Sequence, residues 1–144
     1  MRQSAEQIKR LSLELGGNAP FIVFDDADLE QAIVGVMQSK FRNAGQTCVC
    51  ANRILVQDGI YERFAARLVE EVGKLKVGDG QQAGTSIGPL INAAAVSKVA
   101  RHIDDALSQG AQLLCGGLPS GEGQFVQPTV LGDANPNMLL ASEE

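Results

Sequence analysis

Residues 20–41 read PFIVFDDADLEQAIVGVMQSKF, an apolar run followed by a pattern with helical spacing. The run 21–24 predicts a short strand of the kind that is buried on both faces of a parallel sheet. Aspartates then offer N-caps, and their charge suits a helix N-terminus. The apolar side chains that recur at helical spacing are Leu29, Ile33, Val36, Met37 and Phe41. This stretch therefore predicts one strand and one amphipathic helix, which residues 43–45 end.

The same alternation continues on both sides of this unit. We expect strands at 11–15, 53–57, 111–115 and 125–131, and helices at 60–75 and 92–110. Strands and helices that alternate along a chain pack as layers around a largely parallel sheet. The pattern therefore predicts the α/β class, with three αβα layers and a mostly parallel sheet. The 144 residues contain no internal repeat and no low-complexity linker, so one domain is expected.

The composition excludes several classes of function. The net charge is −5 and no basic cluster could follow a phosphate backbone, so nucleic acid is not an expected partner. No apolar run is long enough to cross a bilayer, and residues 1–6 lack the apolar core of a secretory signal. Three cysteines cannot form an even disulfide framework, which favours reduced thiols in a cytoplasmic protein. No cluster of histidine, cysteine and carboxylate residues predicts a metal site.

Two residues carry candidate chemistry on physical grounds. Cys48 follows a glycine in a loop between a predicted helix and a predicted strand, where a thiol can face a substrate cleft and act as a nucleophile. The alternative is a small buried hydrophobe, as most free cysteines are. Glu14 precedes two glycines in an otherwise apolar strand, so it is either a buried general base or the polar face of a half-buried strand. Spacing alone does not bring the two residues together.

Two motifs resemble those of the aldehyde dehydrogenases. Residues 13–18, LELGGN, resemble the glutamate signature of that family, and residues 41–48, FRNAGQTC, resemble its cysteine signature. Glu14 and Cys48 are 34 residues apart (48 − 14 = 34), a separation typical of the family. Further matches lie at residues 76–79, 88–91, 116–117, 127–129 and 142–144. The chain is thus identified, by resemblance, as a partial aldehyde dehydrogenase catalytic domain over residues 1–144.

The resemblance implies an oxidation in two stages. The thiolate of Cys48 adds to an aldehyde carbon, and the resulting oxyanion is held by the Cys48 N–H and by an asparagine that this chain does not contain. Loss of a hydride, which NADP or NAD accepts, leaves a thioester on the sulfur. Glu14 then deprotonates the water that hydrolyses the thioester.

Arg42 indicates the substrate class. Residues 41–53 are most similar to succinate-semialdehyde dehydrogenases, and an arginine in the same cleft would pair in bidentate fashion with a distal carboxylate. Glutarate semialdehyde satisfies the same reasoning, because one methylene gives only about 1–3 kcal/mol of discrimination. The alternative for Arg42 is a solvated cation at the end of a helix.

The resemblance also implies cofactor contacts and a candidate redox switch. Glu144 is similar to the glutamate that hydrogen-bonds the nicotinamide ribose, and Leu15 and Gly16 lie where relatives approach the nicotinamide with backbone atoms. In some succinate-semialdehyde dehydrogenases a cysteine in the place of Cys50 forms a reversible disulfide with the catalytic one. The alternative is that Cys50 packs as a small strand residue.

Members of this family are several times longer than this chain. The nucleotide-binding half and the segments beyond the last matched motif are missing, so we expect a fragment that does not oxidise aldehydes at a useful rate by itself. Relatives are usually dimers or tetramers, which makes a homo-oligomer and a small semialdehyde the expected partners. Two alternatives stay open: a non-catalytic module that keeps the fold, and a redox sensor built on Cys48 and Cys50.

Overall fold

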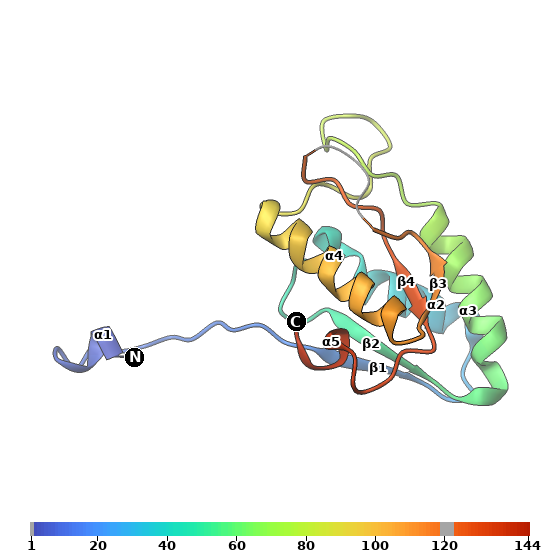
Figure 1. Cartoon of the computed structure of the whole chain (residues 1–144), viewed down its shortest axis with the longest axis horizontal. Helices are drawn as coiled ribbons and strands as arrows, with labels where there is room; N and C mark the ends of the chain where they lie inside the picture. Colours follow the sequence, from blue (N-terminus) through green and yellow to red (C-terminus); the bar gives the residue numbers. More distant parts are fainter. Residues whose placement is uncertain (1, 119–122) are drawn as a thin grey trace.

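The computed structural model describes residues 2–118 and 123–144 (Figure 1). Helices and strands alternate along most of the chain, which confirms the predicted α/β class. No helix in these two ranges is long and apolar enough to cross a membrane. The elements are α1 (Arg2–Ala5), β1 (Ala19–Val23), α2 (Leu29–Lys40), the 3-10 helix η1 (Arg42–Gly45), β2 (Ala51–Val56), α3 (Asp58–Gly73), α4 (Ala93–Ser108), β3 (Gln112–Cys115), β4 (Val130–Gly132) and α5 (Leu139–Ser142).

The strand–helix unit at 20–41 forms as the sequence predicts. Asp28 caps α2, because its side chain accepts a hydrogen bond from the backbone N–H of Gln31 at 3.0 Å. Helix α2 links β1 to β2, which pair in parallel, with Phe21 opposite Ile54. Helix α3 packs against α2. The main core lies between these elements and consists of Val23, Ile33, Val36, Ile60, Phe64, Leu68 and Val72.

The second half of the chain adds α4 and a small hairpin. Asn92 caps α4 by accepting from the N–H of Ala95 at 2.9 Å, and Gly110 ends the helix region with a φ of 96°. Strands β3 and β4 pair antiparallel. The described residues thus form two two-stranded sheets, and the parallel pairing expected of a single sheet is found in β1 and β2. In Figure 1, β3 and β4 lie between α4 and α3, and β3 packs against α3.

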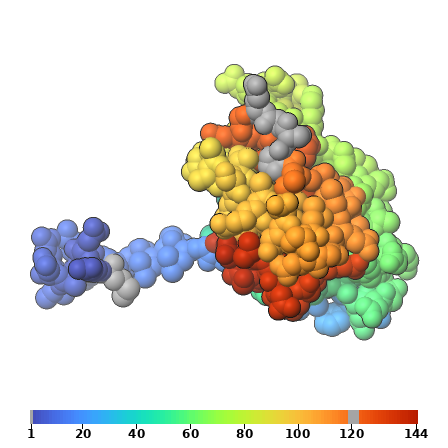
Figure 2. Space-filling view, in the orientation of Figure 1, coloured from blue at the N-terminus to red at the C-terminus, as the bar shows by residue number. Residues whose placement is uncertain are grey.

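Three strand predictions were wrong in detail, and one is a matter of bounds: the strand expected at 125–131 forms only as β4, which begins at Val130. Residues 11–15 do not form a strand: Leu11, Leu13 and Leu15 are 46%, 56% and 72% exposed. The segment has no neighbouring strand within the described ranges, and a lone strand gains no ladder of hydrogen bonds to hold it. We call residues 2–16 the N-terminal arm; Figure 2 shows it projecting from the body of the molecule in dark to light blue.

The second correction concerns the two faces of β1. The run 21–24 was expected to be buried on both sides, but Ile22 and Phe24 are 55% and 60% exposed. Only the face that carries Phe21 and Val23 packs against α2 and α3. The outer face of β1 therefore has no layer over it among the described residues.

Candidate active site

The loop that carries Cys48 begins with an unusual backbone conformation. Directly after α2, three consecutive residues are left-handed: Asn43, Ala44 and Gly45, with φ of 52°, 54° and 75°. Only glycine adopts this region without strain, so Ala44 stores conformational energy here. The turn is closed by the Asn43 side chain, whose Nδ2 donates to the carbonyl of Gln46 at 3.1 Å, and by the N–H of Gln46, which donates to the carbonyl of Asn43. We call residues 41–50 the cysteine loop.

Gln46 ties the cysteine loop to the segment before α4. Its Nε2 donates to the carbonyl of Pro89 at 3.3 Å, and its Oε1 accepts from the N–H of Ile91 at 2.9 Å. The Gln46 side chain thus forms hydrogen bonds with two backbone groups that lie 43 and 45 residues further along the chain. The sequence motif contains Gln46, but its bridging role is visible only in the fold.

The two cysteines of the loop face in different directions. Cys48 is exposed, as expected of a thiol that faces a cleft, and is not the buried hydrophobe of the alternative reading. Cys50 is 1% exposed, and its Sγ lies 2.7 Å from Thr47 Oγ1 and donates to the carbonyl of Lys40 at 3.5 Å. Cys50 therefore packs as a small residue at the start of β2.

The glutamate motif meets the cysteine loop at Gly17. A Cβ at Gly17 would lie 2.5 Å from the carbonyl oxygen of Cys48, so this close approach requires glycine. The carbonyl of Gly17 accepts from Asn52 Nδ2 at 3.5 Å. The carbonyl of Asn18 accepts from Arg53 Nε and Nη2 at 3.1 and 2.6 Å. Residues at the start of β2 thus hold the motif against the loop.

Glu14 itself is exposed and makes no hydrogen bond or ion pair with any residue that the structure describes. It precedes Gly17 by three residues, a reach of at most about 10 Å of extended chain. The structure therefore brings the two motifs together through Gly17 and Cys48, and leaves the Glu14 carboxylate on the exposed arm. The buried glutamate considered from the sequence is not observed.

Two of the three residues assigned to the cofactor lie together. A Cβ at Gly16 would overlap Glu144 Oε2, so the Glu144 carboxylate sits directly over this glycine. Leu15 is 72% exposed beside them. Lys98 Nζ donates to the carbonyl of Glu144, which holds the residue near α4. A carboxylate that accepts hydroxyl donors next to a residue without a side chain fits the ribose end of a nicotinamide nucleotide.

Arg42 stands at the start of η1, six residues before Cys48. Its side chain is exposed and forms no ion pair or hydrogen bond within residues 2–118 and 123–144. The guanidinium keeps all of its donors for an anion that approaches from solvent.

Lys40 is a residue of this site that the sequence analysis missed. Its Nζ donates to Asn52 Oδ1 at 2.6 Å. Burial lowers the pKa of Lys40; the charges of Cys50 and Glu144 oppose this shift, and Lys98 adds to it. The signal was present in the sequence, because Lys40 follows the apolar Val36 by four residues on the same face of the helix.

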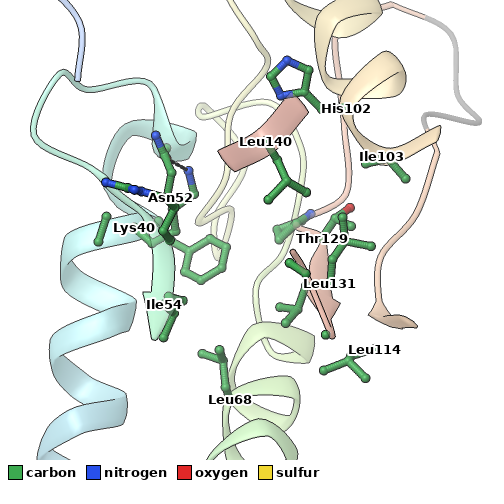
Figure 3. Close-up of a pocket in the computed structure, with 18 of the residues that line it drawn as sticks. Lys40, Asn52, Ile54, Leu68, His102, Ile103, Leu114, Thr129, Leu131 and Leu140 are labelled. Carbon is green, nitrogen blue, oxygen red and sulfur yellow. Dashed lines mark hydrogen bonds between the residues drawn. The ribbon is translucent and has the colours of Figure 1, made fainter. Parts of the chain in front are cut away.

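A cleft of about 1470 Å³ separates β2 from α4 and β4, and its lining includes Gln46, Cys48 and Glu144. Figure 3 shows its two walls. Lys40, Asn52, Ile54 and Leu68 form one wall, and the other wall carries His102, Ile103, Leu114, Thr129, Leu131 and Leu140. No group of three or more metal-ligating side chains occurs in the part of the chain that the structure describes.

Comparison with known proteins gives a consistent picture. A model of the aldehyde dehydrogenase family matches residues 1–144. The chain is 59% identical over its full length to the NADP(+) succinate-semialdehyde dehydrogenase GabD of Escherichia coli (strain K12). It is 57% identical over its full length to a glutarate-semialdehyde dehydrogenase of Pseudomonas putida, and 58% identical over 99% of its length to a 3-sulfolactaldehyde dehydrogenase of Pseudomonas putida.

Among solved structures, the succinate-semialdehyde dehydrogenase of Burkholderia pseudomallei superposes with a TM-score of 0.95 at 56% identity. That match covers 99% of this chain and 30% of the other. The chain likewise spans only about 30% of the length of the curated relatives named above.

Proposed function

This chain belongs to the aldehyde dehydrogenase family, and from that premise we propose that it supplies the nucleophile and the base of an enzyme that oxidises succinate semialdehyde to succinate. The contact between Gly17 and Cys48 carries the proposal, because it joins the glutamate motif to the cysteine motif in space. Since the chain spans about 30% of its relatives, the activity is proposed for a protein of their length.

Cys48 has the position that a nucleophile needs. Its thiol is exposed on a loop that Gln46 and the left-handed turn hold in place, so little reorganisation is needed for attack. The sulfur forms a bond to the aldehyde carbon, and the carbonyl electron pair moves to oxygen. When bound, NADP or NAD supplies the acceptor for the hydride that leaves this carbon.

Glu14 acts in the second stage. After the hydride has left, the carbon is held as a thioester on Cys48. Glu14 removes a proton from a water molecule, the water oxygen bonds to the carbonyl carbon, and the carbon–sulfur bond breaks to return the thiolate. The product is a carboxylate. This role requires the arm to bring Glu14 towards Cys48, which its three-residue distance from Gly17 permits.

The residues around Gly16 suit one end of the cofactor. The Glu144 carboxylate, which lies over Gly16, can accept hydrogen bonds from two ribose hydroxyls. Leu15 offers an exposed apolar surface beside it. The choice of NADP is supported by the Escherichia coli relative, whose name carries it.

Arg42 supports a substrate with an anionic group. The three relatives named above act on succinate semialdehyde, glutarate semialdehyde and 3-sulfolactaldehyde, and each of these aldehydes carries a carboxylate or a sulfonate. Arg42 is exposed, precedes Cys48 by six residues in the chain, and has no competing partner among the described residues. Glutarate semialdehyde remains the alternative substrate, because a longer aldehyde places its carboxylate against the same guanidinium.

The chemistry at Cys48 can be tested without any cofactor. An activated ester such as p-nitrophenyl acetate transfers its acyl group to a reactive thiol, and release of nitrophenol reports the acylation. We expect a burst from the 144-residue chain that Cys48→Ala abolishes and Cys115→Ala retains, because Cys115 lies away from the loop on β3. Equal bursts from both variants would remove Cys48 as the nucleophile and leave a non-catalytic module as the better reading.

The role of Arg42 requires the enzyme expressed from the complete gene. Removal of a charge-assisted hydrogen bond costs about 1.5–3 kcal/mol, so Arg42→Leu should lower kcat/KM for succinate semialdehyde roughly 10- to 150-fold. Butanal lacks the carboxylate, so its kcat/KM should change little. A similar loss with both aldehydes would show that Arg42 acts on the fold instead. Kinetics with four- and five-carbon semialdehydes decide between succinate and glutarate as the product.

Cys50 remains a candidate partner of Cys48 in a redox switch. A disulfide between them requires Cys50 to leave its buried position against Thr47 and Lys40, so the bond would be strained and easily reduced. Treatment with peroxide followed by dithiothreitol tests the switch. Wild type should recover its thiol reactivity and Cys50→Ala should not. If wild type also fails to recover, there is no switch.

The remaining parts of the proposal are a cytoplasmic location and a homo-oligomer. The three cysteines support a reducing compartment, because they are exposed, buried and half-buried and none is in a disulfide. Light scattering of the enzyme expressed from the complete gene measures its oligomeric state, and a monomer would contradict the homo-oligomer.

A further inference from the structure

The position of Lys40 imposes a desolvation cost on its charged side chain. Lys40 lies half-buried at the last position of α2, next to the cysteine loop, and desolvation lowers its pKa. Three charged or titratable groups face it: Cys50, Glu144 and Lys98. A methionine of similar length would avoid the cost of desolvating a charge. Stability alone therefore does not account for a lysine here.

The ammonium selects one orientation of the Asn52 side chain. Lysine is only a donor, whereas the asparagine amide has an acceptor at one end and a donor at the other. Lys40 Nζ faces Asn52 Oδ1 at 2.6 Å, which leaves Asn52 Nδ2 to point the other way (Figure 3). That nitrogen donates to the carbonyl of Gly17 at 3.5 Å. A side chain that could both donate and accept at position 40 would allow the amide to turn over.

Residue 40 also supports the opposite side of the site. A Cβ at Gly45 would lie 3.2 Å from both Lys40 Nζ and the carbonyl oxygen of Lys40. The same carbonyl accepts from Cys50 Sγ. Lys40 therefore accepts a hydrogen bond from the cysteine loop through its carbonyl and reaches the glutamate motif through Asn52.

We propose that Lys40 is a positioning residue, which fixes the amide of Asn52 so that it holds Gly17, and with it the segment that carries Glu14, against the cysteine loop. Gly17 is the last point at which this segment is tied to β2, since residues 2–15 form no hydrogen bond or ion pair with the body in the described part of the chain. The direction in which the arm leaves the body, and so the position of Glu14, depends on this tie. The catalytic consequence rests on the function proposed above, whereas the tie itself does not.

Backbone relaxation by NMR tests the tie directly in this 15.2 kDa chain. The amide of Gly17 should have an order parameter near 0.85 in wild type and below about 0.6 in Lys40→Met and in Asn52→Asp. The carboxylate introduced by Asn52→Asp keeps an oxygen for Lys40 but has no N–H for Gly17. This change therefore removes the hydrogen bond to Gly17 and strengthens the attraction between residue 52 and the Lys40 ammonium. The N–H of Ala19 shares a peptide plane with the Asn18 carbonyl that Arg53 holds, so the Ala19 amide is the internal reference and should stay rigid.

Lys74→Met is the matched control, because Lys74 is an exposed cation at the C-cap of α3 that pairs with Glu70 and Glu71. It should leave Gly17 unchanged. An unchanged Gly17 order parameter in both Lys40→Met and Asn52→Asp would overturn the proposal. Global unfolding of Asn52→Asp would also overturn it, because loss of a residue that only ties Gly17 to the body should leave the fold of the body intact.

The consequence for catalysis is measured with the nitrophenyl ester. Lys40→Met and Asn52→Asp should slow the steady-state rate, which depends on Glu14, about 2- to 10-fold, the loss expected for one hydrogen bond. The burst, which depends on Cys48, should stay within about 2-fold of wild type. A variant that merely weakens the fold would lower both. If Gly17 loosens while wild type shows no ester turnover at all, the tie stands and the proposed function fails.

Discussion

The cysteine loop and the N-terminal arm carry the two halves of one proposed reaction, yet they differ in how they are held. The loop contains a left-handed turn closed by Asn43, and the side chain of Gln46 bridges it to residues 89 and 91. Its buried thiol, Cys50, donates a hydrogen bond to the carbonyl of Lys40. The arm has no such support before Gly17 in the described residues. The proposed nucleophile is therefore held by the loop in the absence of substrate, whereas the segment of the proposed base is held at one end only.

This difference follows from where each segment finds its partners. The loop is held by residues that lie within about 50 positions of it, in α2, β2 and the segment before α4, all of which this chain contains. The arm exposes Leu11, Leu13 and Leu15, side chains that alternate as in a strand but have no sheet beside them in the described ranges. A catalytic group must be held within a fraction of an ångström to act efficiently. The loop meets this requirement here and the arm does not.

The largest expected effect comes from Glu14→Gln. Loss of a general base typically slows the step that it assists by about 10²- to 10⁴-fold, so steady-state ester turnover should fall by that factor while the Cys48 burst remains. Stopped-flow measurement of nitrophenol release separates the two phases. Glu6→Gln, on the same arm, is the control and should change neither phase. A loss of only a few-fold would show that the unsupported arm does not deliver Glu14 to the thioester in this chain.

The next effect concerns the point at which the two regions touch. Gly17→Ala places a methyl group against the carbonyl of Cys48, a backbone atom that cannot move without shifting the loop. Overpacking of this kind costs about 1–3 kcal/mol, measured as a fall in the free energy of urea unfolding. Gly73→Ala at the end of α3 is the control, because nothing lies within 4 Å of its added methyl group. It should be neutral or stabilising by up to about 1 kcal/mol.

Equal stabilities for the two alanine variants would mean that the backbone around Gly17 and Cys48 shifts to accommodate the methyl group at little cost in free energy. The contact at Gly17 would then not hold the two motifs together, and the arm would not be fixed to the loop at this residue. A larger fall for Gly17→Ala, with a slower ester burst, would show that the arm and the loop constrain each other.

The sequence predicted the regular elements better than the support of the site. Helices α2, α3 and α4 and the caps at Asp28 and Asn92 follow from local patterns, because caps and helical periodicity are properties of neighbouring residues. The strand at 11–15 was wrong, since a strand needs a partner that local alternation cannot supply. Ile22 and Phe24 were expected to be buried, but composition does not show whether a second layer covers a sheet.

The candidate site shows the same limit. Cys48, Glu14 and Arg42 are proposed from a family resemblance, whereas Lys40 and Asn52 are not predicted, because motifs of reactive groups do not identify the residues that support them. The pairing of Lys40 with Asn52 crosses twelve residues and depends on the turn at Asn43 and Ala44, which no periodicity predicts. Lys40 was detectable only as a charge on the apolar face of a predicted helix.

A smaller effect is expected from relieving the strain in the cysteine loop. Ala44 has a φ of 54°, a conformation that costs a residue with a Cβ roughly 1–2 kcal/mol. Ala44→Gly removes this cost but adds about 0.4–1 kcal/mol of unfolded-state entropy, so a net gain of up to about 1 kcal/mol in urea unfolding is expected. Ala95→Gly in α4 is the matched control and should lose about 0.5–1 kcal/mol. A loss at both positions would mean that Ala44 is not strained.

The last and smallest effect is a dependence of stability on pH that the half-buried Lys40, at the end of α2, provides. Burial lowers the pKa of Lys40, so the unfolded chain, with a lysine pKa of about 10.4, binds the proton more tightly than the folded chain. Between the lowered pKa and about 10.4 the unfolded state carries more protons, and the free energy of unfolding of wild type relative to Lys40→Met must rise with pH.

The rise is about 1.4 kcal/mol for each tenfold difference in proton affinity between the two states. Lys74, whose pKa is raised by Glu71 and Glu70, acts with the opposite sign but is present in both proteins and cancels. Urea unfolding of the two proteins from about pH 7 to 11 measures the difference. A relative stability that falls with pH would mean that Asn52 and the Glu144 carboxylate stabilise the cation more than burial penalises it. Lys40 would then be an ordinary ion-pair residue.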